Sequence, residues 1–197
     1  EKFAGLRAPV LIEGETGTGK ELAARALHYG GIRSDKPFVP INCGAFPEGL
    51  IENELFGHLK GTFTDARADT PGLVETADGG SLFLDEIDAL TPKAQVALLR
   101  FLQDGSYRPI GSCIERRANV RIIAATNTNL DQLAASGNFR SDLLYRLRVL
   151  TLNMPPLRER REDSLLLARA FFTRFKQENP CKAGRLDESA CSWFNRY

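Results

Sequence analysis

The sequence contains few of the residues that mark metal-binding proteins. Among 197 residues there are four cysteines, two histidines, one methionine and one tryptophan. No C-x-x-C pair occurs among the scattered cysteines, which are Cys43, Cys113, Cys181 and Cys191. Because only His28 and His58 could join them, the spacing argues against a zinc site. We expect reduced thiols that pack in the core or lie at the surface.

Long apolar runs and an excess of one charge are also missing. No stretch approaches the roughly 20 apolar residues that cross a bilayer, and no signal peptide opens the chain. We therefore expect a cytoplasmic protein with no membrane partner. The 26 basic and 25 acidic residues leave a net charge of +1. Such a balance gives no broad footprint for nucleic acid, so DNA would be contacted only through a separate domain, absent from this chain.

The apolar residues, 43% of the chain, suffice for one sizeable core. Helical and strand patterns alternate, which predicts an α/β fold with parallel strands and crossover helices. A helix is expected over Pro92 to Asp104, capped by Thr91 and stopped at Gly105, with Ala94, Ala97, Leu98, Phe101 and Leu102 as its buried stripe. Five strands are expected near residues 10–12, 38–41, 81–84, 120–124 and 149–152, with the third and fourth central because their apolar runs are nearly continuous.

The alternation stops near Pro155 and Pro156. We predict an α/β nucleotide-binding core over residues 1–155 and the start of a helical lid over 156–197, with a helix over 164–177. Between the second and third strands, ELFGHLKGTFTDARADTPG contains Gly57, Gly61 and Pro71. This composition predicts a long excursion from the core, and such loops usually carry function.

The segment VLIEGETGTGK, residues 10–20, predicts a phosphate-binding loop between a strand and a helix. Glycines let bare backbone N–H groups approach a polyphosphate, Lys20 adds a point charge, and the helix dipole favours the same anion. Glu21 stands where a hydroxyl usually contacts magnesium. The predicted ATP-binding residues are Gly14, Glu15, Thr16, Gly17, Thr18, Gly19, Lys20, Glu21 and Leu22.

Two carboxylates follow the apolar strand in GGSLFLDEI, at the strand end that lies beside a phosphate loop. Asp85 can hold Mg²⁺, directly or through water, and Glu86 can orient and deprotonate the attacking water. Glu21 is a second, indirect candidate for the metal. The alternative is that Asp85 and Glu86 only cap the following turn.

Thr126 and Asn127 end the strand VRIIAATN. A polar side chain at this place can hydrogen-bond the γ-phosphate or the lytic water, and turn chemistry explains these residues equally well.

In this order and spacing, GETGTGKE, ELFGHLKGTFTDA, GGSLFLDEI, VRIIAATN and FRSDLLYRLRVLTLNMPPLRER resemble the central AAA+ ATPase domain of bacterial enhancer-binding transcription activators. The resemblance covers essentially the whole chain. It implies a P-loop AAA+ fold with a parallel five-stranded sheet flanked by helices. It also implies an ATPase that uses ATP and Mg²⁺, forms a ring, typically a hexamer, and remodels RNA polymerase carrying sigma-54. A lid completed beyond Tyr197 is a further expectation.

The resemblance also implies roles for single residues. Asn42 would restrain the catalytic Glu86 as a switch, although a turn asparagine explains it as well. Arg140 and Arg146 would reach the neighbouring subunit's ATP, where a guanidinium can neutralise charge on the γ-phosphate. From the residues alone, both arginines fit surface ion pairs. An acidic residue after the P-loop lysine is a mark of this family, so Glu21 fits.

The segment GTFTDA corresponds to the family's GAFTGA loop, whose phenylalanine and threonine touch sigma-54. Thr62 stands in place of alanine and Asp65 in place of the second glycine, which removes a flexible position and adds a negative charge. RPIGSC, residues 108–113, is expected to form a second loop beside it. The expected partner-contact residues are Gly61, Thr62, Phe63, Thr64, Asp65 and Ala66.

The leading hypothesis is therefore a sigma-54-remodelling ATPase. An alternative is a regulatory module that binds ATP to set its oligomeric state without remodelling sigma-54, because the loop is altered. A third, an AAA+ machine for another substrate, is disfavoured by the ELFGH lead-in.

Overall fold

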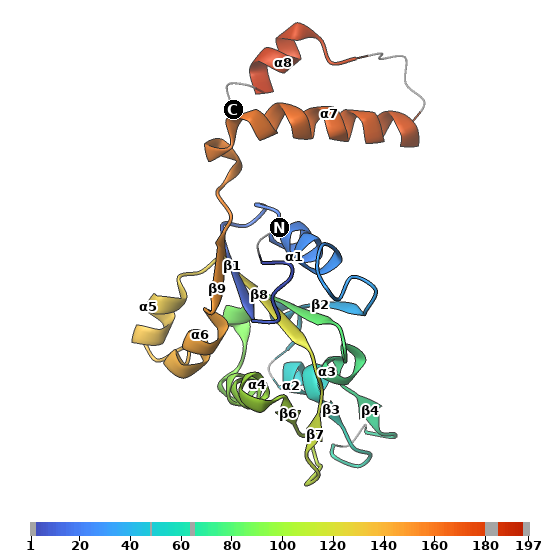
Figure 1. The fold of residues 1–197 in the computed structure, drawn as a ribbon, viewed down its shortest axis with the longest axis vertical. Helices are drawn as coiled ribbons and strands as arrows, with labels where there is room; N and C mark the ends of the chain where they lie inside the picture. Colours follow the sequence, from blue (N-terminus) through green and yellow to red (C-terminus); the bar gives the residue numbers. More distant parts are fainter. Residues whose placement is uncertain (1–2, 48, 64–65, 180–184, 195–197) are drawn as a thin grey trace. The chain divides into compact units, whose positions relative to one another are not determined.

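The computed structural model describes residues 3–47, 49–63, 66–179 and 185–194. The chain divides into two compact units, Glu1–Met154 and Pro155–Tyr197. The first unit is built around one parallel sheet (Figure 1). Its strands are β1 (Val10–Glu13), β2 (Phe38–Asn42), β5 (Ser81–Asp85), β8 (Arg121–Thr126) and β9 (Leu150–Asn153).

The strand order is β2-β5-β8-β1-β9, with β8 at the centre and β5 beside it, as their continuous apolar runs predict. All neighbours pair in parallel, so the predicted α/β fold is confirmed. Each strand runs one or two residues past its predicted end. All but one of the added residues are polar, and all are paired in the ladder register; they are Glu13, Asn42, Asp85, Ala125 with Thr126, and Asn153.

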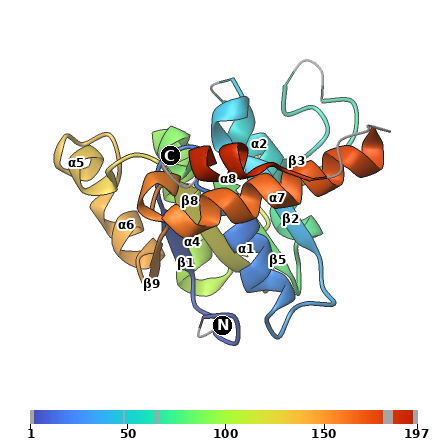
Figure 2. The same cartoon turned by 90° about the horizontal axis from the view of Figure 1, so that it is seen from above.

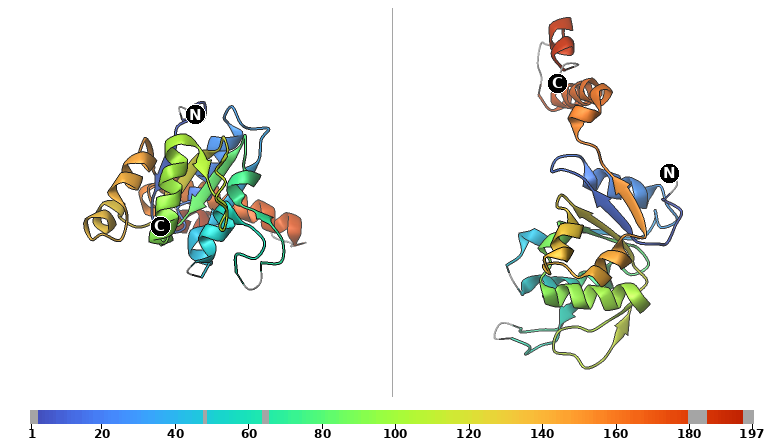
Figure 3. Two further views of the ribbon diagram at one scale, coloured as in Figure 1. Left: turned by 90° about the horizontal axis from the view of Figure 1, so that it is seen from below. Right: turned by 90° about the vertical axis from the view of Figure 1, so that its left-hand side faces the viewer.

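Helices cover both faces of the sheet (Figures 2 and 3). Side chains of successive strand residues point to opposite faces. Val10 and Ile12 therefore pack with α1, whereas Leu11 joins the larger core, to which α2, α4 and α6 contribute. The helices are α1 (Lys20–Tyr29), α2 (Leu50–Phe56), α3 (Leu73–Thr76), α4 (Pro92–Asp104), α5 (Leu130–Ala135) and α6 (Ser141–Leu147).

The helix predicted over Pro92 to Asp104 has these bounds in the structure. The Thr91 hydroxyl accepts a hydrogen bond from the Ala94 N–H at 3.2 Å, and Gly105 ends the helix with φ +74°. Of the predicted stripe, Ala94, Leu98 and Phe101 are buried, whereas Ala97 and Leu102 are only half-buried. The apolar stripe is completed by Leu99, and Gln95 is buried because its amide bonds backbone groups at Leu90, Asn138 and Arg140.

Two short antiparallel ladders leave the core. In the first, β3 (Gly57–His58) pairs with β4 (Thr70–Pro71), so a ladder closes the base of the predicted excursion. In the second, β6 (Ser106–Tyr107) pairs with β7 (Arg116–Arg117), and the hairpin between them contains residues 108–113. Figure 1 shows both projecting from the same end of the first unit.

The second unit contains α7 (Arg161–Glu178) and α8 (Glu188–Phe194). The helix predicted over 164–177 therefore begins three residues earlier and ends one residue later. Within the described residues, no helix has the length and apolar character that a membrane span requires. That part of the chain also holds no cluster of three or more metal-ligating side chains of the His, Cys, Asp and Glu type.

Candidate functional site

The phosphate-binding loop joins β1 to α1, and its glycines meet two different requirements. Gly17 and Gly19 have φ of +81° and +92°, in the left-handed region that favours glycine. Gly14 is required by crowding instead, because a Cβ there would lie 2.7 Å from the Met154 carbonyl oxygen. The loop is also fastened to the sheet, since the Gly14 N–H donates to the Thr126 carbonyl at 3.2 Å.

Lys20 is the first residue of α1, and its ammonium group lies inside the loop. It donates to the carbonyl oxygens of Gly14 at 2.9 Å and Glu15 at 3.1 Å. The carboxylate of Glu21 instead accepts from the Arg25 guanidinium, at 3.0 and 2.7 Å. The side chains of Glu21 and Arg25 are both half-exposed, and the two residues lie one helical turn apart on α1. Lys20 is thus placed for a phosphate, whereas Glu21 is engaged with Arg25.

Asp85 and Glu86 lie at the carboxyl end of β5. Burial raises the pKa of Asp85, and its hydrogen bond from the Glu86 N–H, 3.0 Å long, and the charge of Lys20 offset this in part. A half-buried carboxylate whose burial outweighs the compensating charge of Lys20 is suited to bind a hard cation. Among the described residues, Glu86 is the one non-glycine residue with a left-handed backbone, at φ 52° and ψ 51°.

Asn42 ends β2, directly beside Asp85 in the ladder register. Its side-chain oxygen accepts from the Gly44 N–H at 2.8 Å. The Glu86 carboxylate lies over the same glycine, in the space that a Cβ at position 44 would occupy. Gly44 therefore lies between the two side chains that the resemblance pairs as a switch, and within the described part of the chain no direct hydrogen bond joins them.

The end of β8 is organised around Asp88, which follows Glu86 by two residues. The Thr126 hydroxyl donates to Asp88 Oδ1 at 2.5 Å, and the Thr128 hydroxyl donates to Oδ2 at 3.0 Å. Thr126 is fully buried, so its hydroxyl faces Asp88 rather than the phosphate loop. Asn127, between them, donates from Nδ2 to the Thr16 hydroxyl at 2.8 Å. Of the two candidates at this strand end, only Asn127 hydrogen-bonds the phosphate loop with its side chain, whereas Thr126 does so with its carbonyl.

Arg140 and Arg146 belong to the region of α6 and are both exposed. Arg140 precedes the helix and forms a two-point ion pair with Asp142, at 3.0 and 2.8 Å. This pair raises the pKa of Arg140. Arg146 is in the last turn and makes no ion pair with the described residues. Neither arginine hydrogen-bonds the phosphate loop within that part of the chain.

In the expected partner loop, Gly61, Thr62, Phe63 and Ala66 are described, whereas Thr64 and Asp65 lie outside the described residues. The Gly61 N–H donates to the Ala66 carbonyl at 2.8 Å, which closes the loop. Phe63 is 43% exposed, and its ring centroid lies 4.8 Å from that of the buried His58. An exposed phenylalanine is thus presented near the loop tip.

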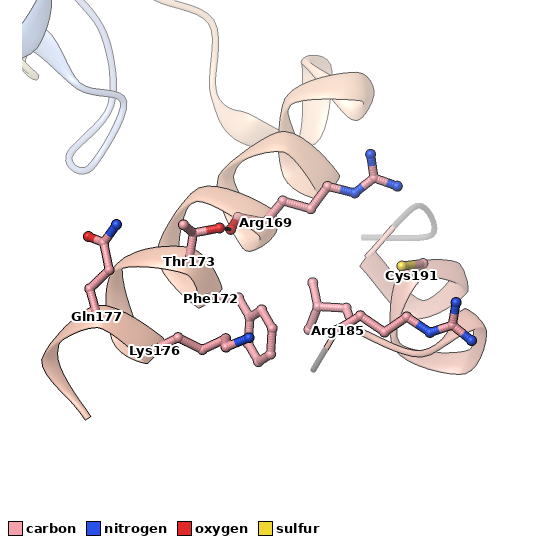
Figure 4. Close-up of a pocket in the computed structure, with 8 residues that line it drawn as sticks. Arg169, Phe172, Thr173, Lys176, Gln177, Arg185 and Cys191 are labelled. Atoms are coloured by element: carbon pink, nitrogen blue, oxygen red, sulfur yellow. Dashed lines mark hydrogen bonds between the residues drawn. The ribbon is translucent and has the colours of Figure 1, made fainter. Parts of the chain in front are cut away.

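A cavity of about 690 Å³ lies in the second unit, between α7 and α8 (Figure 4). Arg169, Lys176 and Arg185 line it, and the Lys176 ammonium lies 5.8 Å from the Phe172 ring centroid. None of its lining residues belongs to the phosphate loop or to the ends of β5 and β8. Its size therefore does not identify it as the nucleotide site, because a phosphate loop binds its anion through backbone amides.

Sequence reasoning missed Asp88 and Gly44. Asp88 carried a weak signal, an acidic residue two positions after Glu86, but nothing local indicated its threonine partners 38 and 40 residues later. Gly44 gave no signal, since its importance comes from the side chain of Glu86, which follows β5 about 40 positions later in the chain.

Comparisons with known proteins show the family and the fold. The family model described as a sigma-54 interaction domain matches residues 1–153. The chain is 46% identical over 197 residues to the Nif-specific regulatory protein of Azospirillum brasilense, covering 98% of this chain and 32% of that protein. It is 49% identical over 191 residues to the regulatory protein AtoC of Escherichia coli K12, covering 97% and 41%. This chain thus spans less than half of either relative.

A crystal structure of NtrX from Brucella abortus in complex with ADP superposes with a TM-score of 0.89. The two are 33% identical, and the match covers 100% of this chain and 43% of NtrX. The complex of NtrX with ATP gives a TM-score of 0.85 at the same identity. The five-stranded parallel sheet agrees with these matches, and the chain belongs to the sigma-54 interaction domains, the AAA+ ATPase-type domains of bacterial transcription regulators.

Proposed function

We propose that this chain is an Mg²⁺-dependent ATPase that uses hydrolysis to move the Phe63 loop against sigma-54. The movement would remodel the RNA polymerase holoenzyme and permit open-complex formation, in the cytoplasm where that enzyme works. The observation that carries the proposal is the 2.8 Å hydrogen bond from Asn127 to Thr16. It brings the end of β8 onto the phosphate loop, beside the carboxylates that end β5.

Nucleotide binding follows from the loop. The N–H groups around Gly17 and Gly19 and the ammonium of Lys20 would hold the phosphates of ATP. Exchange of its two carbonyl partners for phosphate oxygens would strengthen the Lys20 contacts, because hydrogen bonds between ions are the stronger kind. The complexes of NtrX with ADP and ATP, 33% identical to this chain, support this assignment.

The metal ligand would be Asp85. Its raised pKa means that ionisation is costly in the protein alone, and a cation would relieve that cost. Bound Mg²⁺ would neutralise charge that develops on the phosphates. Glu21 is ionically paired with Arg25, so we assign it no direct metal contact.

Hydrolysis would use Glu86 as general base. Its carboxylate would accept a proton as the water oxygen attacks the γ-phosphorus and the bond to the β–γ bridging oxygen breaks, leaving ADP and phosphate. Asn127 would orient the γ-phosphate or the water, with Thr126 holding it in place through Asp88. The strained backbone of Glu86 is typical of functional positions.

We assign Asn42 the switch role through Gly44. Because the Glu86 carboxylate lies over Gly44 and Asn42 holds the Gly44 N–H, movement of this turn would release the base. Arg140 and Arg146 would act on the neighbouring subunit's ATP in a ring, a hexamer by family resemblance. Turnover would then depend on assembly.

A second candidate function is a regulatory module whose ATP-dependent assembly controls transcription without remodelling sigma-54. Thr62 and Asp65, which replace residues of the family's loop, favour it. Restoring alanine and glycine at these positions distinguishes the two. A gain of sigma-54 engagement on restoration argues for the regulatory module in the natural sequence, whereas engagement that is already present argues for remodelling.

The Glu86→Gln variant tests the proposal. We expect ATP binding within about threefold of the natural chain and turnover lowered at least about a hundredfold, because the amide keeps the shape but cannot accept the proton. Mixing Glu86→Gln with Arg146→Ala subunits should restore part of the turnover, since some interfaces then contain both groups. Undiminished turnover in Glu86→Gln would remove Glu86 from its role. Binding of sigma-54 in the presence of ADP and aluminium fluoride tests the partner.

A further inference from the structure

The two excursions that leave the core are hydrogen-bonded to each other. Ile110, in the hairpin between β6 and β7, donates its N–H to the Gly57 carbonyl at 2.8 Å. Its carbonyl accepts from the Leu59 N–H at 3.0 Å, so Ile110 pairs with His58 as a parallel bridge. The β6–β7 hairpin thus adds a residue to the base of the Phe63 loop, although about 50 positions separate them (Figure 1).

Thr62 makes a further connection at this junction. Its hydroxyl lies 2.6 Å from the Leu59 carbonyl oxygen, in its own loop, and 3.2 Å from that of Ile110, in the other excursion. A single O–H proton is therefore shared between the two excursions. The Thr62 side chain also lies against Gly111, the residue that follows Ile110 in the chain.

Gly111 leaves the space that Thr62 fills. A Cβ at position 111 would overlap the Thr62 hydroxyl oxygen and lie 3.2 and 3.3 Å from Thr62 Cγ2 and Cβ. Gly111 also has φ +81°, so its own backbone disfavours a side chain. The two residues are therefore complementary: threonine at 62 requires glycine at 111.

We infer that Thr62 and Gly111 form a clasp that joins the Phe63 loop to the β6–β7 hairpin, with Thr62 as a positioning residue for Phe63. Because Phe63 is the next residue after Thr62, the clasp would fix the direction in which the exposed Phe63 ring points. The threonine that departs from the family's alanine is then a supporting contact rather than a lost hinge. The consequence for sigma-54 rests on the proposed function, whereas the clasp itself does not.

A double-mutant cycle on the full chain tests the clasp. Gly111→Ala introduces the φ strain and the overlap with the Thr62 hydroxyl, whereas in a Thr62→Ala background the strain and the 3.3 Å contact with the Cβ at position 62 remain. The matched control is Gly137→Ala, which has φ +78° and nothing within 4 Å of its Cβ. We expect Gly111→Ala to lower the midpoint of thermal unfolding more than Gly137→Ala does. Most of this excess should disappear in the Thr62→Ala background, which removes the hydroxyl and the methyl group of Thr62.

Loop attachment is measured separately by trypsin cleavage at the exposed Lys60 and Arg67, which flank the loop. Thr62→Val keeps the shape and loses the hydroxyl, so we expect cleavage about fivefold faster, the effect of one intramolecular hydrogen bond. Thr62→Ser should stay within about twofold of the natural chain. Thr70→Val, an exposed position on β4, is the control for a threonine-to-valine change.

Sigma-54 capture with ADP and aluminium fluoride gives the functional result. We expect Thr62→Val to weaken capture by about fivefold and Thr62→Ser to restore it. If Gly111→Ala is equally harmful with threonine and alanine at 62, or if Thr62→Val is cleaved no faster, the clasp is overturned. If the natural chain captures no sigma-54 while the cycle still shows coupling, the clasp stands and the proposed partner fails.

Discussion

Asp88 offers the sharpest test of how the ATP site is held together. The Asp88→Ala change removes the acceptor of two hydroxyls, one from Thr126, which is fully buried, and one from Thr128, which is exposed. Because Thr128 is exposed, water can replace Asp88 as the acceptor of its hydroxyl. Losing this hydrogen bond therefore costs about 0.5 kcal/mol, the low end of the range for one hydrogen bond. The Thr126 oxygen still accepts from the Thr128 N–H at 3.0 Å, but its proton then has only the Thr128 carbonyl as acceptor among the described residues, at 3.3 Å.

A buried O–H proton left without a good acceptor costs about 1–3 kcal/mol. Because the Thr128 carbonyl offers a longer hydrogen bond, we take about 1.5 kcal/mol for Thr126. The free energy of unfolding should then fall by about 2 kcal/mol in total. For a chain of this size, that corresponds to a midpoint of thermal unfolding about 4–8 °C lower. Urea titration and calorimetry measure both quantities.

Asp88→Asn is the matched control. Its Oδ1 still accepts from Thr126, and its amide can donate to the Thr128 hydroxyl, which already lies 3.1 Å from Asn127 Oδ1 as an alternative acceptor. We expect a loss below about 1 kcal/mol. In Asp88→Ala, the turn that carries Asn127 is released, so kcat for ATP should fall about tenfold or more while KM changes little.

The separate readouts distinguish a positioning role from a purely structural one. If Asp88→Ala lowers the unfolding midpoint but leaves kcat of the folded protein unchanged, Asp88 supports the fold and does not position Asn127. If alanine and asparagine are equally stable, the carboxylate does not hold Thr126. Either result would refute the reasoning given for this end of β8.

Three further predictions concern ionisable groups. Burial raises the pKa of Asp85, so the folded chain holds this proton more tightly than the unfolded chain and loses stability as pH rises above about 4. Asp85→Asn should therefore unfold at the same or a higher temperature than the nucleotide-free natural chain at pH 7, and a clearly lower midpoint would contradict this. Burial lowers the pKa of His28 below 6.5, so stability should be present above that pH and decrease as pH falls through the window below it. His28→Gln should flatten this dependence in unfolding experiments. Burial also raises the pKa of Cys43 to about 12, so iodoacetamide at pH 8 should modify the exposed Cys113 and leave Cys43 unmodified until the chain unfolds, as mass spectrometry would detect.

The elements that local patterns determine could be predicted from the sequence. β8 contains a nearly continuous apolar run, and α4 carries its own signals at both ends, Thr91 and Gly105. The phosphate loop is equally local, because its glycines, Lys20 and the following helix are adjacent in the chain. These signals suffice for the sheet and for the position of the site along it.

Contacts between polar side chains on different elements could not be predicted in this way. Asn127 reaches Thr16 across 111 positions, and Thr62 reaches Ile110 across 48. Such hydrogen bonds depend on the register of the sheet and on the course of loops, and they leave no periodic pattern. The burial of Gln95 on α4 could not be predicted for a related reason, because its amide bonds backbone groups of the segment before α6. Ala97 and Leu102 of the predicted stripe pack against the core but are only half-buried.

The two arginines proposed to act in a neighbouring site differ in whether an ion pair must be broken before each can reach a phosphate. Arg140 is held by two hydrogen bonds to Asp142, and its guanidinium could reach a phosphate only by exchanging that carboxylate for another anion. Arg146 makes no ion pair with the described residues and is exposed at the end of α6, so it bears no such cost. In the proposed ring, Arg146 is therefore the better candidate for direct contact with the γ-phosphate. Arg140, which Asp142 already orients, is better placed to stabilise the interface between subunits, and that interface would bring Arg146 to the neighbouring ATP.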